Sequence, residues 1–286
     1  ALELTSGLNY NYEHSEADDY DGGEHNRNRT ALFAAMKFDK NKLLATLSAR
    51  EELVEGDAMP FSPAVGAQYL PSENLRLTGN VSRSYRIPTM NDLYWNAFGA
   101  SGNPDLQAEE SWSEEAAIHF QTKIGGEGKL AWTATVFSSQ VDDWILWRQE
   151  SFNWTPENIK KVWSRGSESR VSVTWQLLSV RTSLSGLYSF TKSTNADDYS
   201  PNNGQIGKQL VFTPVHEGSI TLKADWNKWA LLMTGNVTGK QYTDDDNSES
   251  FAMDPYGTLN AWVSREIGNA RPFKGKIIAE INNILN

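Results

Sequence analysis

Two acidic side chains, Glu109 and Glu115, are the residues of this chain best spaced to act together. They lie six residues apart, so on an extended strand, where side chains alternate between faces, both point to the same side. His119 follows with the same parity, and the row of two carboxylates and one imidazole could bind a proton or a metal ion. The other interpretation is a hydrated polar wall, which we favour for His119. A carboxylate shielded from bulk water needs a charged or hydrogen-bonding partner, so a pair buried from water predicts cations on a facing segment.

Other patterns that could support catalysis or metal binding are weak. The histidines, at positions 14, 25, 119 and 216, have no metal-ligand spacing, and no G-x-S-x-G motif is present. The acidic runs 18–21 and 244–246 offer hard oxygen ligands for calcium but follow no EF-hand pattern. We therefore predict no catalytic residues, no metal site and no cofactor. Aromatic residues in expected loops, Tyr94, Trp95 and Tyr199, could stack on a ligand or cap the rim of the fold.

The elements that must position these residues are β-strands. Leu43, Ala45, Leu47 and Ala49 alternate with Leu44, Thr46, Ser48 and Arg50, which is the period of a strand with one apolar face. Glycine or proline occurs in most of the connections between such segments. The thirteen expected strands span residues 1–12, 27–38, 43–50, 62–70, 75–85, 112–122, 129–147, 160–176, 180–191, 211–226, 229–240, 254–267 and 274–285.

The connections between the expected strands alternate in length. Long ones start at residues 13, 54, 86, 148, 192 and 242, and short ones start at 39, 71, 124, 177 and 226, with a looser one at 267. An outer-membrane barrel has short turns on one side and long loops on the other, whereas the Greek-key crossings of a soluble sandwich disturb that order. The sequence therefore predicts an all-β, antiparallel up-and-down meander that forms part of a transmembrane β-barrel. Its apolar face should carry Leu32, Met36, Leu47, Ile118, Phe120, Trp132, Val136, Val173, Leu222 and Leu231.

Composition narrows the class of protein. The 286 residues carry a formal net charge of −10 and no cysteine, which argues against a nucleic-acid surface and excludes a disulfide framework. No window approaches the length of a membrane helix. The mean hydropathy of −0.54 is compatible with a barrel, because only alternate residues of its strands face lipid.

The long loop after residue 85 contains an ordered series of motifs. Arg86 and Pro88 form R-x-P, Leu93 closes a hydrophobic-aromatic turn, and Gly102-Asn103-Pro104 with Leu106 precedes Glu109 and Glu115. This series resembles the signature of the TonB-dependent outer-membrane receptors. Within this part of the chain, Ala108 stands where the family usually has proline and Ala117 where it often has glycine. Later stretches also resemble that family. These stretches are Asn158 with Gly166–Glu168, Gly207–Leu210, Pro214–His216, Gly239–Asp244 and Ile281–Asn286.

The resemblance implies a larger receptor around this segment. The family barrel has 22 strands, and the chain would correspond to strands nine to twenty-one, with the N-terminal plug domain and the last strand absent from residues 1–286. Glu109 and Glu115 would then face the lumen and pair with arginines of the plug. The run from Tyr85 to Trp95 is most similar to cobalamin-type receptors.

The function that the resemblance implies is TonB-dependent uptake of a scarce nutrient across the cell outer membrane. Cobalamin is the first expectation for the cargo, and a ferric siderophore or haem is a close second. The implied partners are a TonB-type energy transducer, acting through the plug, the small nutrient ligand and the lipid bilayer, with no nucleic acid. Two other classes stay open: an outer-membrane barrel enzyme, and a β-rich binding or adhesion protein without transport.

Overall fold

A computed structural model describes residues 1–150, 152–197, 204–270 and 273–285. Leaving out the two-residue strands β4 (Asp57–Ala58), β7 (Asn96–Ala97) and β8 (Ala100–Ser101), thirteen strands of one sheet pair in sequence order. These are β1 (Leu2–Glu16), β2 (Glu24–Lys40), β3 (Leu43–Val54), β5 (Ser62–Ser72), β6 (Leu75–Arg86), β9 (Glu109–Ile124), β10 (Gly128–Glu150), β11 (Asn153–Leu177), β12 (Val180–Asn195), β13 (His216–Trp226), β14 (Trp229–Thr238), β15 (Tyr256–Ala270) and β16 (Phe273–Ile281).

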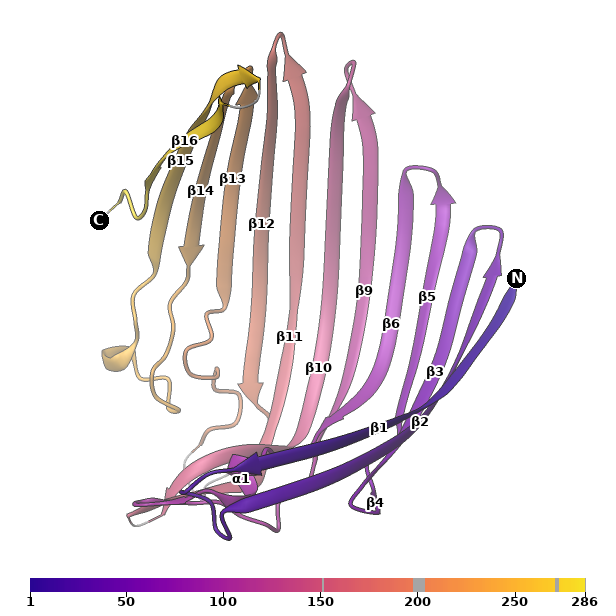
Figure 1. Ribbon diagram of the computed structural model, residues 1–286, viewed down its shortest axis with the longest axis vertical. Helices are drawn as coiled ribbons and strands as arrows, with labels where there is room; N and C mark the ends of the chain where they lie inside the picture. Colours follow the sequence, from indigo (N-terminus) through magenta and orange to yellow (C-terminus); the bar gives the residue numbers. More distant parts are fainter. Residues whose placement is uncertain (151, 198–203, 271–272, 286) are drawn as a thin grey trace.

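The sheet is a curved, open meander (Figure 1). Each of the thirteen strands pairs antiparallel with its neighbours, and β1 and β16 form the two edges. The short turns lie at one end of the sheet and the long connections at the other, where the single-turn helix α1 (Met90–Tyr94) also lies. The predicted all-β meander is confirmed. Within the described ranges, no helix has the length and apolar character needed to cross a membrane.

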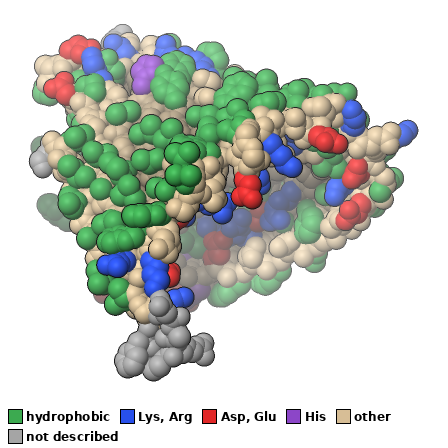
Figure 2. Space-filling model, turned by 90° about the horizontal axis from the view of Figure 1, so that it is seen from above, with side chains coloured by type: hydrophobic (Ala, Val, Ile, Leu, Met, Phe, Trp, Pro, Cys, Tyr) green, Lys and Arg blue, Asp and Glu red, His purple; other side chains and the backbone are tan. Residues whose placement is uncertain are grey.

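The register separates the side chains into two faces. Cross-strand partners point to the same side, and the pairs Met36–Leu47, Ile118–Ala134, Phe120–Trp132 and Leu222–Met233 all lie on one face. All ten residues expected on the apolar face share it by register. Seen along the strands, hydrophobic side chains cover the outside and charged ones gather in the hollow (Figure 2). Large side chains stay exposed on the outside, as Leu32 at 62% and Val136 at 57% show, because no second layer covers this convex face.

Several expected strand ends are wrong. Most strands from β1 to β12 extend further toward the long-loop end, whereas β13, β14 and β15 are shorter there than expected. β1 and β2 continue to Glu16 and from Glu24, because polar pairs such as Tyr12–Asn26 and Arg27–Glu13 extend the ladder where apolar alternation stops. β10 and β11 form a hairpin that reaches Glu150 and Asn153, through the expected loop after residue 147. β9 starts at Glu109, and β13 starts at His216 instead of Val211.

Candidate functional site

The long loop between β6 and β9, residues 87–108, is held at its base by an ion pair. Arg86 and Glu109 lie directly opposite each other in the register. The Arg86 guanidinium donates through Nε to Glu109 Oε2 at 2.7 Å and through Nη2 to Oε1 at 2.5 Å. The backbone N–H of Ile145 also donates to Oε1, at 2.8 Å. Because Glu109 is only 8% exposed, these three donors compensate its charge within the chain.

Asp92 connects the loop to the neighbouring hairpin. Thr89 caps α1 by a capping box, in which its hydroxyl accepts from the Asp92 N–H while the Asp92 carboxylate accepts from the Thr89 N–H. The indole Nε1 of Trp147 on β10 donates to Asp92 Oδ1 at 2.9 Å. Arg86 Nη1 lies 3.8 Å from Oδ2. The buried Asp92 carboxylate therefore ties together the helix, the base of the loop and the β10–β11 hairpin.

The charge of Asp92 should make the loop sensitive to acid. Burial raises the pKa of this carboxyl, but hydrogen bonds from Thr89 and Trp147 and the charge of Arg86 outweigh burial, so the pKa is lowered from 3.8. A lowered pKa contributes stability that is present above the unfolded-state pKa and is lost as pH falls through the folded-state value. We expect pepsin cleavage within residues 87–108 to rise as pH falls below about 3.8. Asp92→Asn should loosen the loop at neutral pH and flatten this dependence, whereas Asp105→Asn, in the same loop but exposed, should leave it unchanged.

The glycine and asparagine of the loop motif fold it back on α1. A Cβ on Gly102 would lie 2.6 Å from the carbonyl carbon of Leu93 and 2.7 Å from the N of Tyr94, so only glycine fits without movement of backbone. The Asn103 N–H donates to Asp92 O at 2.8 Å, and the Asn103 side chain donates to Pro156 O at 3.1 Å. Pro104 and Leu106 complete the turn, in which the Leu106 N–H donates to Asn103 O. The motif residues therefore build the loop, and their assignment to a family function stays a prediction.

A second loop, residues 17–23, docks on this one although it is about 70 positions away in the sequence. The rings of His25 and Tyr94 are parallel within 2°, with centroids 3.5 Å apart, and Tyr20 contacts Trp95 edge-on. Backbone bonds join Asp21 N–H to Tyr94 O and Asn96 N–H to Asp19 O. Tyr94 and Trp95 thus contribute to contacts between loops. Ligand stacking by these two residues stays a prediction, and Tyr199 lies outside the described residues.

Sequence reasoning missed an ionic cluster at the same end of the concave face. Glu52, 2% exposed, accepts from Arg29 Nε at 2.8 Å and from the Tyr85 hydroxyl, and it lies 3.4 Å from Arg50. Glu13 pairs with Arg29 at 2.7 Å and with Arg27 at 2.6 Å. Arg27 in turn donates to the carbonyl of buried Pro88. The shared parity of Arg27 and Arg29 was a usable signal, but their carboxylate partners depend on strand pairing.

Glu109 and Glu115 lie on the concave face but in different environments. The resemblance implied a lumen-facing carboxylate at each position with its partner on the plug, and the structure buries Glu109 against Arg86 of the same chain. Glu115 is exposed opposite Asn80 and Phe137, and no ion pair involves it in the part of the chain that the structure describes. Pairing with a plug arginine stays a prediction for both residues.

His119 is hydrogen-bonded to the hydroxyls of Thr78 and Thr133, each at 3.2 Å, as a polar wall would be. Over the described ranges, no group of three or more acidic or histidine side chains could hold a metal ion.

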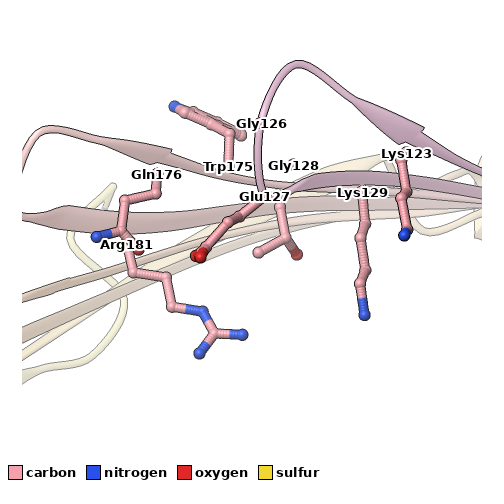
Figure 3. A pocket seen from close by; sticks show the side chains of 9 residues that line it. Lys123, Gly126, Glu127, Gly128, Lys129, Trp175, Gln176 and Arg181 are labelled. Atoms are coloured by element: carbon pink, nitrogen blue, oxygen red, sulfur yellow. The ribbon is translucent and has the colours of Figure 1, made fainter.

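Cations gather on the concave face near the short-turn end. A pocket of about 520 Å³ is lined by Lys123, Lys129, Arg181 and Glu127 among others. Figure 3 shows the ends of these four side chains on one side of the sheet, while Trp175 points to the opposite side. No ion pair neutralises Lys123, Lys129 or Arg181 within the described segments. This region of the hollow is therefore electropositive and accessible.

The chain is similar in sequence to known transporters. A family model described as "TonB dependent receptor-like, beta-barrel" matches residues 1–284. The vitamin B12 transporter BtuB of Photobacterium profundum is 22% identical over 281 residues, which cover 96% of this chain and 43% of that protein. BtuB of Vibrio vulnificus (strain YJ016) is 26% identical over 175 residues, 59% of this chain and 27% of the relative. The chain therefore spans less than half the length of these relatives.

Solved structures share the fold. The siderophore receptor PirA of Pseudomonas aeruginosa superimposes with a TM-score of 0.73 at 15% identity, over 99% of this chain and 48% of that chain. PirA of Acinetobacter baumannii gives 0.75 at 14% identity, over 99% and 48%. At such identities the likeness concerns the fold alone, and it matches the open meander to a part of each of these barrels.

Proposed function

This chain belongs to the TonB-dependent receptor β-barrel family, and from that membership we propose that it forms part of the barrel wall of an outer-membrane receptor. That receptor would take up a nutrient by TonB-dependent transport. The observation that carries the proposal is the pair of contrasting faces on one meander. An apolar convex face suits lipid, and a charged concave face suits an aqueous lumen. The proteins that the chain resembles are transporters and receptors and not enzymes, so we assign no catalytic step.

The structured loop 87–108 supports a role at the ligand-entry side. It lies at the long-loop end, which faces outward in barrels of this kind. Its ion pair, capping box and docked neighbour hold it in one conformation, and a preorganised loop loses less entropy when a ligand binds. In this proposal the outer loops capture the nutrient. A TonB-type transducer then acts on a plug domain, and the cargo passes through the lumen. Glu115, exposed on the concave face, is the available carboxylate for a plug arginine.

For the cargo we propose cobalamin, since the curated relatives are named as vitamin B12 transporters. A ferric siderophore is the second candidate. The electropositive stretch of the concave face formed by Lys123, Lys129 and Arg181 would favour a negatively charged iron chelate on its way through the lumen.

Uptake by whole cells tests the proposal. The full-length protein that contains this barrel segment is expressed in a host lacking its own receptors for both cargoes. We expect uptake of labelled cobalamin that disappears when the host's TonB-type transducer is deleted. Uptake of ferric siderophores only would move the assignment to the second candidate. If neither cargo enters the cell although the protein reaches the outer membrane, transport of these nutrients is refuted.

A further inference from the structure

Two cations face each other on the apolar side of the sheet. Arg165 on β11 and Lys192 on β12 are direct partners in the register. They share the convex face with Val171, Val173 and Leu184, because cross-strand partners and alternate residues along each strand lie on one side. Like charges directly opposite each other destabilise a sheet. An anion bound by both side chains would relieve this repulsion.

This pair differs from neighbouring cations in having no acidic partner. Lys161 lies 3.1 Å from Asp142, and Arg83 pairs with Glu110. Over the described residues, no carboxylate comes within 4 Å of Arg165 or Lys192. The local charge of this spot is therefore about +2.

Neighbouring groups hold the Arg165 guanidinium in place. Its carbon lies 3.8 Å from the centroid of the Trp163 ring, and Nη1 donates to Thr194 Oγ1 at 2.9 Å and to Trp163 O at 3.0 Å. The Trp163 indole is itself fixed by donating to Ser138 Oγ at 3.1 Å. With Nη1 occupied, Nε and Nη2 stay available as the two-pronged donor that suits a phosphate. Lys192, which is exposed, adds a flexible second cation.

The pair lies where the apolar band should end on the outer side. Trp175, near the short turns, and Arg165 are ten residues apart on the same face of β11. Ten residues span about 33 Å along a strand, which at a tilt of about 40° is about 25 Å across the bilayer, the height of the apolar band of such barrels. Arg165 and Lys192 therefore sit at the level of lipid headgroups on the long-loop side.

An apolar groove adjoins the pair on the same face. It has a volume of about 340 Å³, and its lining includes Tyr188, His216, Val237 and Gly257, which lie on the convex face by register, together with Glu217, which has the opposite parity. The Tyr188 hydroxyl and His216 Nδ1 are hydrogen-bonded to each other at 2.8 Å. Phe190, opposite His216 in the register, lies two residues before Lys192 on β12. A phosphate on the cations would thus leave an attached hydrocarbon chain beside an apolar groove.

We propose that Arg165 and Lys192 form a binding site for the phosphate of a phosphorylated outer-leaflet glycolipid, whose acyl chain lies along the Tyr188–His216 groove. The occupant is a lipid and not free phosphate, because the cations adjoin an apolar groove on the membrane-facing side. The inference rests on the proposed outer-membrane placement of the barrel. It does not depend on which nutrient is transported.

The test uses the purified full-length protein in nanodiscs that contain either diphosphorylated lipid A or its phosphate-free form. Bound lipid is counted by native mass spectrometry, and affinity is measured by titration. We expect retention of the phosphorylated form only. Each of Arg165→Gln and Lys192→Gln should weaken binding about fivefold, and the double variant about 25-fold, because each cation near a charged lipid surface contributes a similar increment.

The control is Arg170→Gln with Lys129→Gln, which removes the same charge from the concave face of β11 and β10. Equal weakening in this control, or equal binding of the phosphate-free lipid, overturns the proposal. Displacement of the lipid by millimolar inorganic phosphate shows a free-phosphate site and also overturns it. Membrane fractionation of every variant gives a separate readout. A protein that reaches the outer membrane but ignores the lipid phosphate refutes this inference alone, and one that never reaches it refutes the proposed function.

Discussion

Arg86→Met should destabilise the protein by about 2 to 3 kcal/mol, because it leaves the Glu109 carboxylate buried without a counter-charge. Glu109 is 8% exposed and keeps only the Ile145 N–H as a donor after the change. The Arg86 side chain is itself 48% exposed, so the expected loss lies below that of a fully buried pair. Urea unfolding of the lipid-reconstituted protein, followed by tryptophan fluorescence, measures the free energy of unfolding.

Two further variants distinguish the effect of breaking the buried pair from the effect of removing any arginine charge. Arg83→Met removes an arginine from the same strand, but its partner Glu110 is about one-third exposed, so we expect a loss below about 1 kcal/mol. The double variant Arg86→Met with Glu109→Met should recover much of the stability, because it leaves no unpaired charge. If Arg86→Met and Arg83→Met lower the free energy of unfolding by the same amount, the Arg86–Glu109 pair does not hold the base of the loop.

Gly102→Ala should lower the free energy of unfolding by about 1 to 3 kcal/mol and displace the loop from α1. The added methyl group would sit 2.6 Å from a backbone carbon of Leu93, and backbone cannot rotate away as a side chain can. The shift should break the bond from Asn103 to Pro156 and loosen the contact with the β10–β11 hairpin. Thermal unfolding reports the cost, and protease cleavage between residues 87 and 108 reports the displacement.

Gly186→Ala is the matched control for this glycine. A Cβ at Gly186 would meet its nearest neighbour, the Cγ1 of Val171, at 3.6 Å, an ordinary contact. Because alanine also restricts the unfolded chain more than glycine, we expect this variant to be neutral or slightly more stable. A loss at Gly186 as large as that at Gly102 would mean that close backbone approach is not what demands glycine in the loop.

The sequence by itself determined the class of fold. Strict alternation along segments such as 43–50 assigns each side chain to one face, and the ordered change of long and short connections indicates a meander. Both signals are local, since the period of two comes from the backbone and a turn is encoded in a few residues. These two signals predicted thirteen strands and an apolar face that carries ten named residues. The structure agrees with both predictions.

The residues at which the strands begin and end could not be predicted from these local signals. The ends of β1, β2, β10 and β11 carry polar side chains that look like loop when taken alone. They form strands because a partner strand supplies bonds such as Tyr12 to Asn26. Whether a polar stretch continues a ladder depends on what lies opposite, and that is a property of the pairing and not of the stretch itself.

Only the tertiary structure decided the partners of the charged residues. Glu109 and Glu115 have the same parity and the same chemistry, yet one is buried against Arg86 and the other lies open. The register between β6 and β9 places Arg86 opposite Glu109 and places Asn80 opposite Glu115. In the same way, the contact of Tyr20 with Trp95 and the cluster around Glu52 join residues from distant parts of the chain. Parity assigns a side chain to a face, but the strand that folds beside it determines which charge it meets.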